Sequence, residues 1–221
     1  MVGRDAATTR ERHDLIARLG ALSADPAVHT LVIEGAGRHL CTGFDLASLE
    51  AETDATLLHR MVRIEQMLAM LWRVPMRTCA LGRGRITGAG ADLFAACDHR
   101  LIAPDASLQF PGVRFGLVLG TRRLGARVGA DRALRILAGG ERVTAEVALA
   151  IGLATESLSQ PELPDPAPPV VTRETFAALR RALDDGGADR DLAALVRSAA
   201  RPGLKGRIET YVATLRAERQ G

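Results

Sequence analysis

The sequence predicts an α/β fold, and three observations support this class. Short runs rich in β-branched residues alternate with longer segments of helical periodicity over the first 160 residues. Glycine-rich turns follow two of the apolar runs, as at the ends of strands. A proline-rich stretch, residues 161–169, precedes a purely helical tail. We therefore expect a core domain over residues 1–160, an extended connector over 161–169 and a helical oligomerisation region over 170–221.

The individual elements follow from hydrophobic spacing and from helix start and stop signals. The predicted helices of the core cover residues 8–22, 55–72, 91–97, 122–128, 131–138 and 144–150, the last with Thr144 as its N-cap. The predicted strands cover 29–34, 78–81, 100–103 and 107–110, and we expect the first two to be buried. The predicted helices of the tail cover 173–183, 191–200 and 203–219.

The amino-acid composition argues against several classes of protein. The 221 residues are 47% hydrophobic and 25% charged, as in ordinary globular proteins. The net charge of +3 comes from arginines that are spread along the chain, and aromatic residues make up only 3%, so nucleic acid is not an expected partner. The longest apolar run, residues 147–154, is far shorter than the ~20 residues of a membrane-spanning helix. Three cysteines in apolar surroundings and a charged N-terminus favour the cytoplasm.

Several familiar site motifs are absent from the sequence. Two glycine clusters resemble dinucleotide-binding turns, but Leu40 and Leu93 stand where the third glycine belongs. No group of His, Cys, Asp and Glu has metal-ligand spacing, and no serine lies in a Gly-x-Ser-x-Gly turn. We therefore expect neither a nicotinamide site nor a metal site.

A pair of glycine-rich turns, residues 41–45 and 88–90, is the most informative feature. Two such turns can direct peptide N–H groups at one point, and a helix N-terminus adds about half a positive charge there. Paired N–H donors are what the oxyanion of a thioester carbonyl requires. The same glycines are equally suited to permit tight turns and close packing of a helix on a strand.

Together these segments resemble the enoyl-CoA hydratase/isomerase (crotonase) superfamily. The stretch LVIEGAGRHLCTGFDLASL is similar to the family's strand, turn and Gly-x-Asp loop, and TCALGRGRITGAGADLFAACDHRLIA is similar to its second oxyanion segment. The order of elements over 106–158 and the closing helix RPGLKGRIETYVATLRAER are similar as well. The resemblance implies a fold of repeated ββα turns, a C-terminal helical trimerisation region and a homotrimer or hexamer.

The resemblance also implies a ligand, an acyl-CoA thioester whose enolate is stabilised in an oxyanion hole. The hole would consist of the peptide N–H groups of Phe44 and Ala89. No separate cofactor is implied, because coenzyme A is part of the substrate. The positions implied to lie around the substrate are Gly43, Asp45, Gly88, Gly90 and Gly112.

Two departures from the family pattern bear on the reaction. Hydration in the family uses two glutamates, and here Asp92 and Gly112 occupy those positions. A glycine cannot move a proton, so Asp92 is the single predicted acid/base, unless it only serves the helix dipole. Glu141 and Glu146 are the nearest replacement acids in sequence. Ala47 stands where many members carry a lysine near the nucleotide end of coenzyme A, which leaves an acyl carrier thioester as an alternative ligand.

Two hypotheses follow. In the first, the protein is an enzyme that acts through an enolate by isomerisation, dehydration or decarboxylation rather than hydration. In the second, it is a non-catalytic or accessory member that binds a thioester or a partner enzyme. In both, we expect the tail to pack on a neighbouring subunit rather than to close its own core, because the connector detaches it. Its apolar face is formed by Phe176, Leu179, Leu183, Leu192, Leu195 and Val196.

Overall fold

The computed structural model describes residues 9–158 and 170–218, with side chains from residue 15 onward. Within these residues, two sheets lie in the core. The first is fully parallel and has the order β1 (Thr30–Ile33), β2 (Arg77–Gly82), β4 (His99–Ile102) and β7 (Glu156–Ser157). The second has the order β3 (Arg85–Thr87), β5 (Ser107–Gln109) and β6 (Val143–Thr144), with only β6 antiparallel. The predicted α/β class is confirmed.

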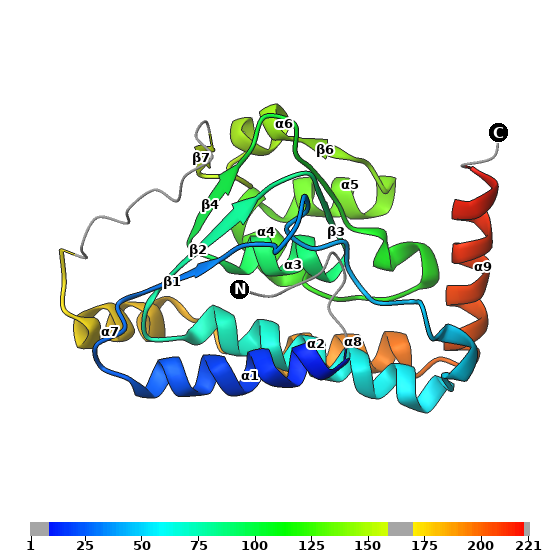
Figure 1. Ribbon diagram of the computed structural model, residues 1–221, viewed down its shortest axis with the longest axis horizontal. Coiled ribbons are helices and arrows are strands. Elements are labelled where there is room, and N and C mark those ends of the chain that lie inside the picture. The colour runs from blue at the N-terminus through cyan, green and yellow to red at the C-terminus, as the bar shows by residue number, and fades with distance from the viewer. Residues whose placement is uncertain (1–8, 159–169, 219–221) are drawn as a thin grey trace.

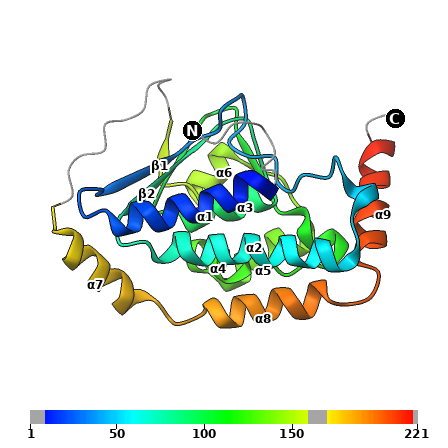
Figure 2. The same ribbon diagram turned by 60° about the horizontal axis from the view of Figure 1, so that its bottom comes forward.

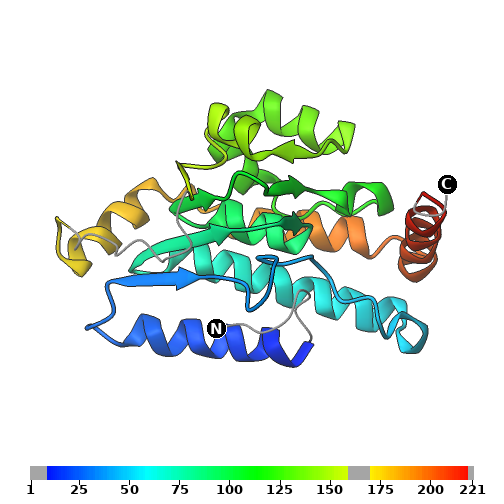
Figure 3. The same cartoon turned by 45° about the horizontal axis from the view of Figure 1, so that its top comes forward.

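A repeating unit explains why there are two sheets. β2 and β3 precede the helix α3 (Ala89–Ala96), and β4 and β5 precede the helix α4 (Thr121–Val128). The equivalent strands of the two units pair with each other, β2 with β4 and β3 with β5, both in parallel. Each ββα unit therefore adds one strand to each sheet, as the predicted fold of repeated ββα turns requires (Figure 3).

Three of the helices form a layer on one side of the core. α1 (Thr9–Ala24), α2 (Asp54–Arg73) and α8 (Ala188–Ala199) lie side by side, with α2 in the middle (Figure 1, Figure 2). Threonine side chains at 53, 144 and 172 accept hydrogen bonds from the first turns of three helices, which confirms Thr144 as an N-cap. The remaining described helices are α5 (Ala130–Gly139), α6 (Ala145–Ala150), α7 (Arg173–Leu183), α9 (Leu204–Ala217) and the 3₁₀ turns η1 (Leu49–Ala51) and η2 (Pro111–Phe115).

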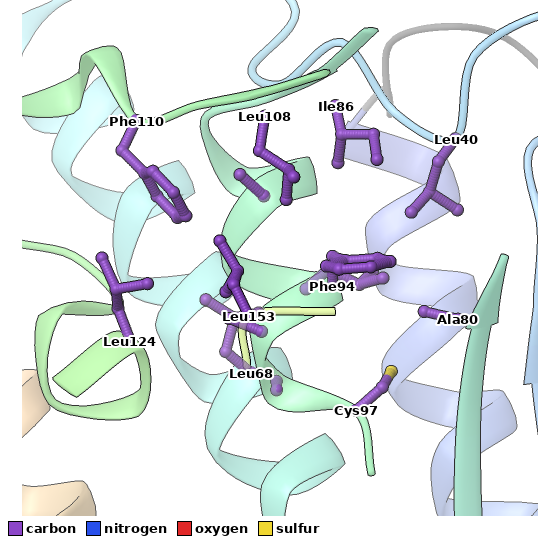
Figure 4. Packing of buried hydrophobic residues seen from close by; sticks show 14 of the residues in the cluster. Leu40, Leu68, Ala80, Ile86, Phe94, Cys97, Leu108, Phe110, Leu124 and Leu153 are labelled. Atoms are coloured by element: carbon purple, nitrogen blue, oxygen red, sulfur yellow. The ribbon is translucent and has the colours of Figure 1, made fainter. Parts of the chain in front are cut away.

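The hydrophobic core surrounds α3. Phe94, in the middle of this helix, is completely buried and lies between side chains from both sheets and from α2 (Figure 4). Every residue of α3 after Ala89 is buried, so close packing holds this helix in place. Among the residues labelled around it are Leu40, Leu68, Ala80, Ile86 and Leu153.

The structure differs from the predicted elements where strands are short or lie at an edge. β1 is not buried as expected, because it is the edge strand and only Ile33 is fully covered. The strands β3, β6 and β7 were not predicted, since two or three residues carry no periodicity. α3 starts at Ala89, two residues earlier than expected, because Gly90 lies inside the helix.

The prediction that the tail does not close its own core is wrong for α8 and α9, whereas Leu179 and Leu183 of α7 stay exposed as expected. α8 packs along α2, and Leu195 of α8 is completely buried. The first turns of α9 are covered as well, at Leu204 and Ile208. The physical reason is that α2 has a second apolar face, on the side away from α1, and α8 covers this face. The predicted connector, residues 161–169, lies outside the described residues.

Several of the arginines that give the chain its positive charge cap the C-termini of helices. Arg173 donates to the last carbonyls of α1, Arg180 to Trp72 of α2, and Arg207 to the end of α8. At α3, Arg127 binds the carbonyls of residues 95 and 97, and Arg100 binds residue 97 as well. The guanidinium group suits this role because it offers several donors and a charge that complements the helix dipole.

Candidate active site

The two glycine-rich turns meet in the structure. Gly43 has a φ of +102°, and a Cβ there would lie 2.8 Å from the carbonyl oxygen of Thr87. The peptide N–H of Thr87 donates to the carbonyl of Cys41 at 3.0 Å. A side chain at Gly43 would therefore push the turns apart, and this glycine permits their contact.

The second turn opens α3. Gly88, the N-cap, has a φ of +56° and donates its N–H to Gln109 at 2.9 Å. The next N–H, that of Ala89, donates to no described residue and stands at the positive end of the helix dipole. Gly90 packs against the first turn, since a Cβ there would come within 2.3 Å of the carbonyl oxygen of Cys41. The start of α3 thus presents a backbone donor beside the first turn.

A cavity of about 540 Å³ lies in front of both turns. Its walls include residues of α2, α3, η2, α5 and α9, so segments far apart in the sequence enclose it. The polar residues that line it include Thr42, Thr87, Asp92, Gln109 and Tyr211. The apolar residues include Met61, Ile64, Leu117, Leu137, Ile208 and Leu215. This mixture is typical of a site for a largely apolar ligand with a few orienting contacts.

Asp92 is the buried carboxyl of this cavity. Its residue is only 5% exposed, and burial raises its pKa to about 8, although Arg123 acts to lower it and Glu65 to raise it. Among the described residues, none donates a hydrogen bond to this carboxyl. Its oxygen lies against Gly120, where a Cβ would be only 1.9 Å away. At neutral pH the folded protein therefore holds Asp92 mainly in the protonated form.

A second buried carboxyl is missing from the described part of the cavity. Gly112 lines it, and a Cβ there would meet Leu117 at 3.6 Å, which is ordinary contact. Glu141 and Glu146 are exposed and do not line the cavity. The other acidic lining residue is Glu218, at the exposed rim and 3.9 Å from Arg114. Asp92 thus stands alone as the enclosed acid.

Six of the eight residues predicted for the site line one cavity, namely Gly43, Phe44, Gly88, Ala89, Asp92 and Gly112. Asp45 and Gly90 do not line it. The carboxylate of Asp45 accepts the N–H of Ala47 at 2.9 Å, and its carbonyl accepts a hydrogen bond from Arg60. Arg60 also stacks on the Phe44 ring, with its guanidinium carbon 3.9 Å from the ring centroid. Asp45 therefore shapes the first turn.

Neither the residues of α9 that line the cavity nor the arginines that line it were identified from the sequence. Tyr211 and Ile208 of α9 line the cavity, and the tail was expected on a neighbouring subunit. Three exposed arginines, Arg85, Arg114 and Arg142, also line the cavity, and guanidinium groups are well suited to bind phosphates. No group of His, Cys, Asp and Glu able to hold a metal occurs in the described ranges. No helix in those ranges is long and apolar enough to cross a membrane.

Known proteins share both the sequence pattern and the architecture. A crystal structure from Bordetella parapertussis, assigned to the enoyl-CoA hydratase/isomerases, is 42% identical and superposes with a TM-score of 0.91 over 96% of this chain and 92% of that one. A probable enoyl-CoA hydratase of Mycobacterium leprae is 37% identical over 61% of this chain and 54% of its own length. An ethylmalonyl-CoA decarboxylase of Danio rerio is 36% identical over 58% of this chain and 44% of its own.

The chain spans about half the length of the curated relatives that it matches. The model of one family, enoyl-CoA hydratase/isomerase, matches residues 5–179, which include both glycine-rich turns and Asp92. With the ββα repeat and the shared architecture, this match confirms the resemblance. The chain belongs to the enoyl-CoA hydratase/isomerase family and has the crotonase fold.

Proposed function

We propose that the protein acts on an acyl thioester, of coenzyme A or of an acyl carrier protein, by stabilising the enolate of the acyl group. The peptide N–H groups of Phe44 and Ala89 bind the thioester oxygen, where negative charge develops as the enolate forms. The observation that carries this proposal is the meeting of two backbone turns at one cavity that also holds the buried carboxyl of Asp92.

Asp92 moves the proton in this proposal. One carboxyl can take a proton from one carbon and return it to another, or give a proton to an enolate, but it cannot also activate water at a second position. Gly112 offers no group for that second task. The proposed chemistry is therefore isomerisation or decarboxylation. Hydration is not expected, and neither is dehydration, because it is the reverse of hydration and passes through the same transition state.

Decarboxylation of a malonyl-type thioester is the second, more specific candidate. Its first step needs no base, because the bond from the α-carbon to the carboxylate breaks, carbon dioxide leaves and the electron pair forms the enolate. Asp92 then gives its proton to the α-carbon and regains one from solvent. The raised pKa of Asp92, about 8, supplies the acid that this step requires. The similarity to ethylmalonyl-CoA decarboxylases supports the same choice.

A panel of three thioesters tests these proposals. Crotonyl-CoA reports hydration, a 3-enoyl-CoA reports isomerisation and ethylmalonyl-CoA reports decarboxylation. We expect turnover of the second or third and negligible hydration. Hydration at ordinary enzyme rates, about 10 s⁻¹ or more, would overturn the single-carboxyl mechanism. Strong thermal stabilisation by a thioester analogue without turnover would support the accessory alternative instead.

Gly112→Glu makes the test more specific, because a Cβ at this position makes only ordinary contact with Leu117 and the position lines the cavity. The variant supplies the missing carboxylate, and we expect hydratase activity to rise by on the order of 10²- to 10⁴-fold. Gly112→Gln is the matched control, since it has the same size without an ionisable group. An equal gain in both variants would contradict the proposed role of the carboxylate.

Assembly and location remain part of the proposal. We propose a homotrimer or hexamer in the cytoplasm. The assembly would cover apolar side chains that stay exposed on the described surface, at Leu134, Leu179 and Leu183. Nucleic acid and membranes are not proposed as partners. Light scattering of the purified protein tests the assembly, and a stable monomer at micromolar concentration would contradict it.

A further inference from the structure

A chain of alternating charges runs from the buried side of the site to the surface. Neighbouring members are joined by ion pairs of 2.6 to 3.0 Å, and the exposed fraction of the side chains rises from 0–1% at the inner end to 70% at the outer end. In order from the inside, its members are Glu65, Arg123, Asp191, Arg122, Asp185 and Arg190.

The inner end of this chain is a fully buried ion pair. One guanidinium nitrogen of Arg123 donates to both oxygens of Glu65, at 2.7 and 2.6 Å. The other donates to Asp191 of α8 at 3.0 Å. Arg123 therefore faces two carboxylates, one from α2 and one from the tail. Replacing such a pair by apolar side chains is often neutral or stabilising, so fold stability alone does not account for it.

This pair adjoins Asp92. α3 packs against both α2, which carries Glu65, and α4, which carries Arg123. The Asp92 carboxyl lies against Gly120, the N-cap of α4, only three residues before Arg123. Arg123 favours the ionised form of Asp92, and Glu65 opposes it. The remaining charged groups that line the cavity, Arg85, Arg114, Arg142 and Glu218, are exposed at its rim.

We propose that Glu65 is a positioning residue for Asp92, and that Glu65 and Asp191 together cancel the charge of Arg123 so that the buried arginine does not draw the proton off Asp92. The inference rests on the proposed function, in which Asp92 carries the proton. It gives α8 a role in the chemistry, because the tail supplies the second carboxylate. An uncancelled arginine beside a buried carboxyl favours the ionised form of that carboxyl, so less of the acid would be present at neutral pH.

The proton affinity of Asp92 can be measured without a substrate. In the unfolded chain Asp92 ionises near its ordinary pKa of 3.8, and in the folded protein near 8. Between these values the folded state binds one more proton, so stability falls as pH rises and levels off above about 8. Asp92→Asn lacks this dependence. The ratio of the unfolding constants of the two proteins therefore changes tenfold per pH unit and levels off at the folded pKa of Asp92.

Glu65→Gln tests the inference. The unfolding constants of Glu65→Gln and of the double variant Glu65→Gln/Asp92→Asn are measured against pH, and the levelling point is the pH at which their ratio stops changing. We expect the levelling point to move down by about one pH unit or more, since the variant leaves Arg123 uncancelled. Asp191→Asn should move it in the same direction by less, and it replaces Glu65→Gln if that variant does not fold. Asp185→Asn is the matched control at the exposed end of the charge chain and should leave the point unchanged.

An unchanged levelling point in Glu65→Gln, or in Asp191→Asn where that variant carries the test, overturns the inference. So does an equal shift in the Asp185→Asn control. Because the readout is a proton affinity, it is independent of turnover. A shift in a protein that turns over no thioester would support the inference and refute the proposed function, whereas turnover by Asp92 without any shift would do the reverse.

Discussion

The two glycine-rich turns and the C-terminal tail line the same cavity by different means. The turns contribute backbone, held in place by glycines such as Gly43 that no other residue replaces without a clash. The tail contributes side chains, such as Tyr211 of α9, through helices that dock on the core. The difference teaches that, in the proposed function, the turns supply the backbone donors for the chemistry, whereas the tail contributes side chains to the cavity wall.

The largest expected effect is in the turns. Ala89→Pro removes the peptide N–H at the first position of α3, where the proline ring itself is tolerated. If this N–H binds the thioester oxygen, turnover falls by on the order of 10²- to 10³-fold. Turnover and melting temperature are measured together, because Gly88 precedes the substitution and its backbone is constrained by proline. Wild-type turnover in a folded variant would refute the donor.

The docking of α8 on the core is tested by measuring the free energy of unfolding. Leu195→Ala removes a completely buried side chain between α8 and α2, and we expect a loss of about 2–5 kcal/mol in the free energy of unfolding. Leu183→Ala is the matched control, because this leucine of α7 is 85% exposed and should change stability by less than about 0.5 kcal/mol. Denaturant titrations measure both. Equal effects of the two substitutions would mean that α8 is not part of the core.

The smallest expected effect concerns the rim. Arg114 and Glu218 are 3.9 Å apart and about half exposed, so Arg114→Ala should cost less than about 1 kcal/mol in stability. If the rim arginines bind the phosphates of coenzyme A, the Kd for free coenzyme A rises several-fold while stability hardly changes. Calorimetric titration measures this, with Arg190→Ala as a control far along the charge chain. Equal Kd values in both variants would exclude Arg114 from the binding site.

The sequence allowed the turns to be predicted because their signals are local. Gly43 and Gly88 both have the positive φ that their turns require, and Asp92 was identified because it occupies the position of the family's first glutamate. The docking of α8 and α9 could not be predicted, because an apolar helix face does not specify which surface covers it. The partners of Arg123 were hidden for the same reason, since Glu65 and Asp191 are 58 and 68 residues away.

Exchange of the α-protons of a saturated acyl-CoA in D₂O is the most direct test of the central claim, that Asp92 and the two turns form and protonate an enolate. It requires no knowledge of the natural substrate. Exchange begins with the ionised carboxylate, so its rate should rise about tenfold per pH unit and level off near pH 8, the pKa of Asp92.

Mass spectrometry of the recovered thioester measures the incorporated deuterium. We predict exchange by the wild-type protein and a loss on the order of 10²- to 10⁴-fold in Asp92→Asn, a variant of the same shape without the ionisable group. No exchange by the wild-type protein, or undiminished exchange by a folded Asp92→Asn variant, would contradict the account.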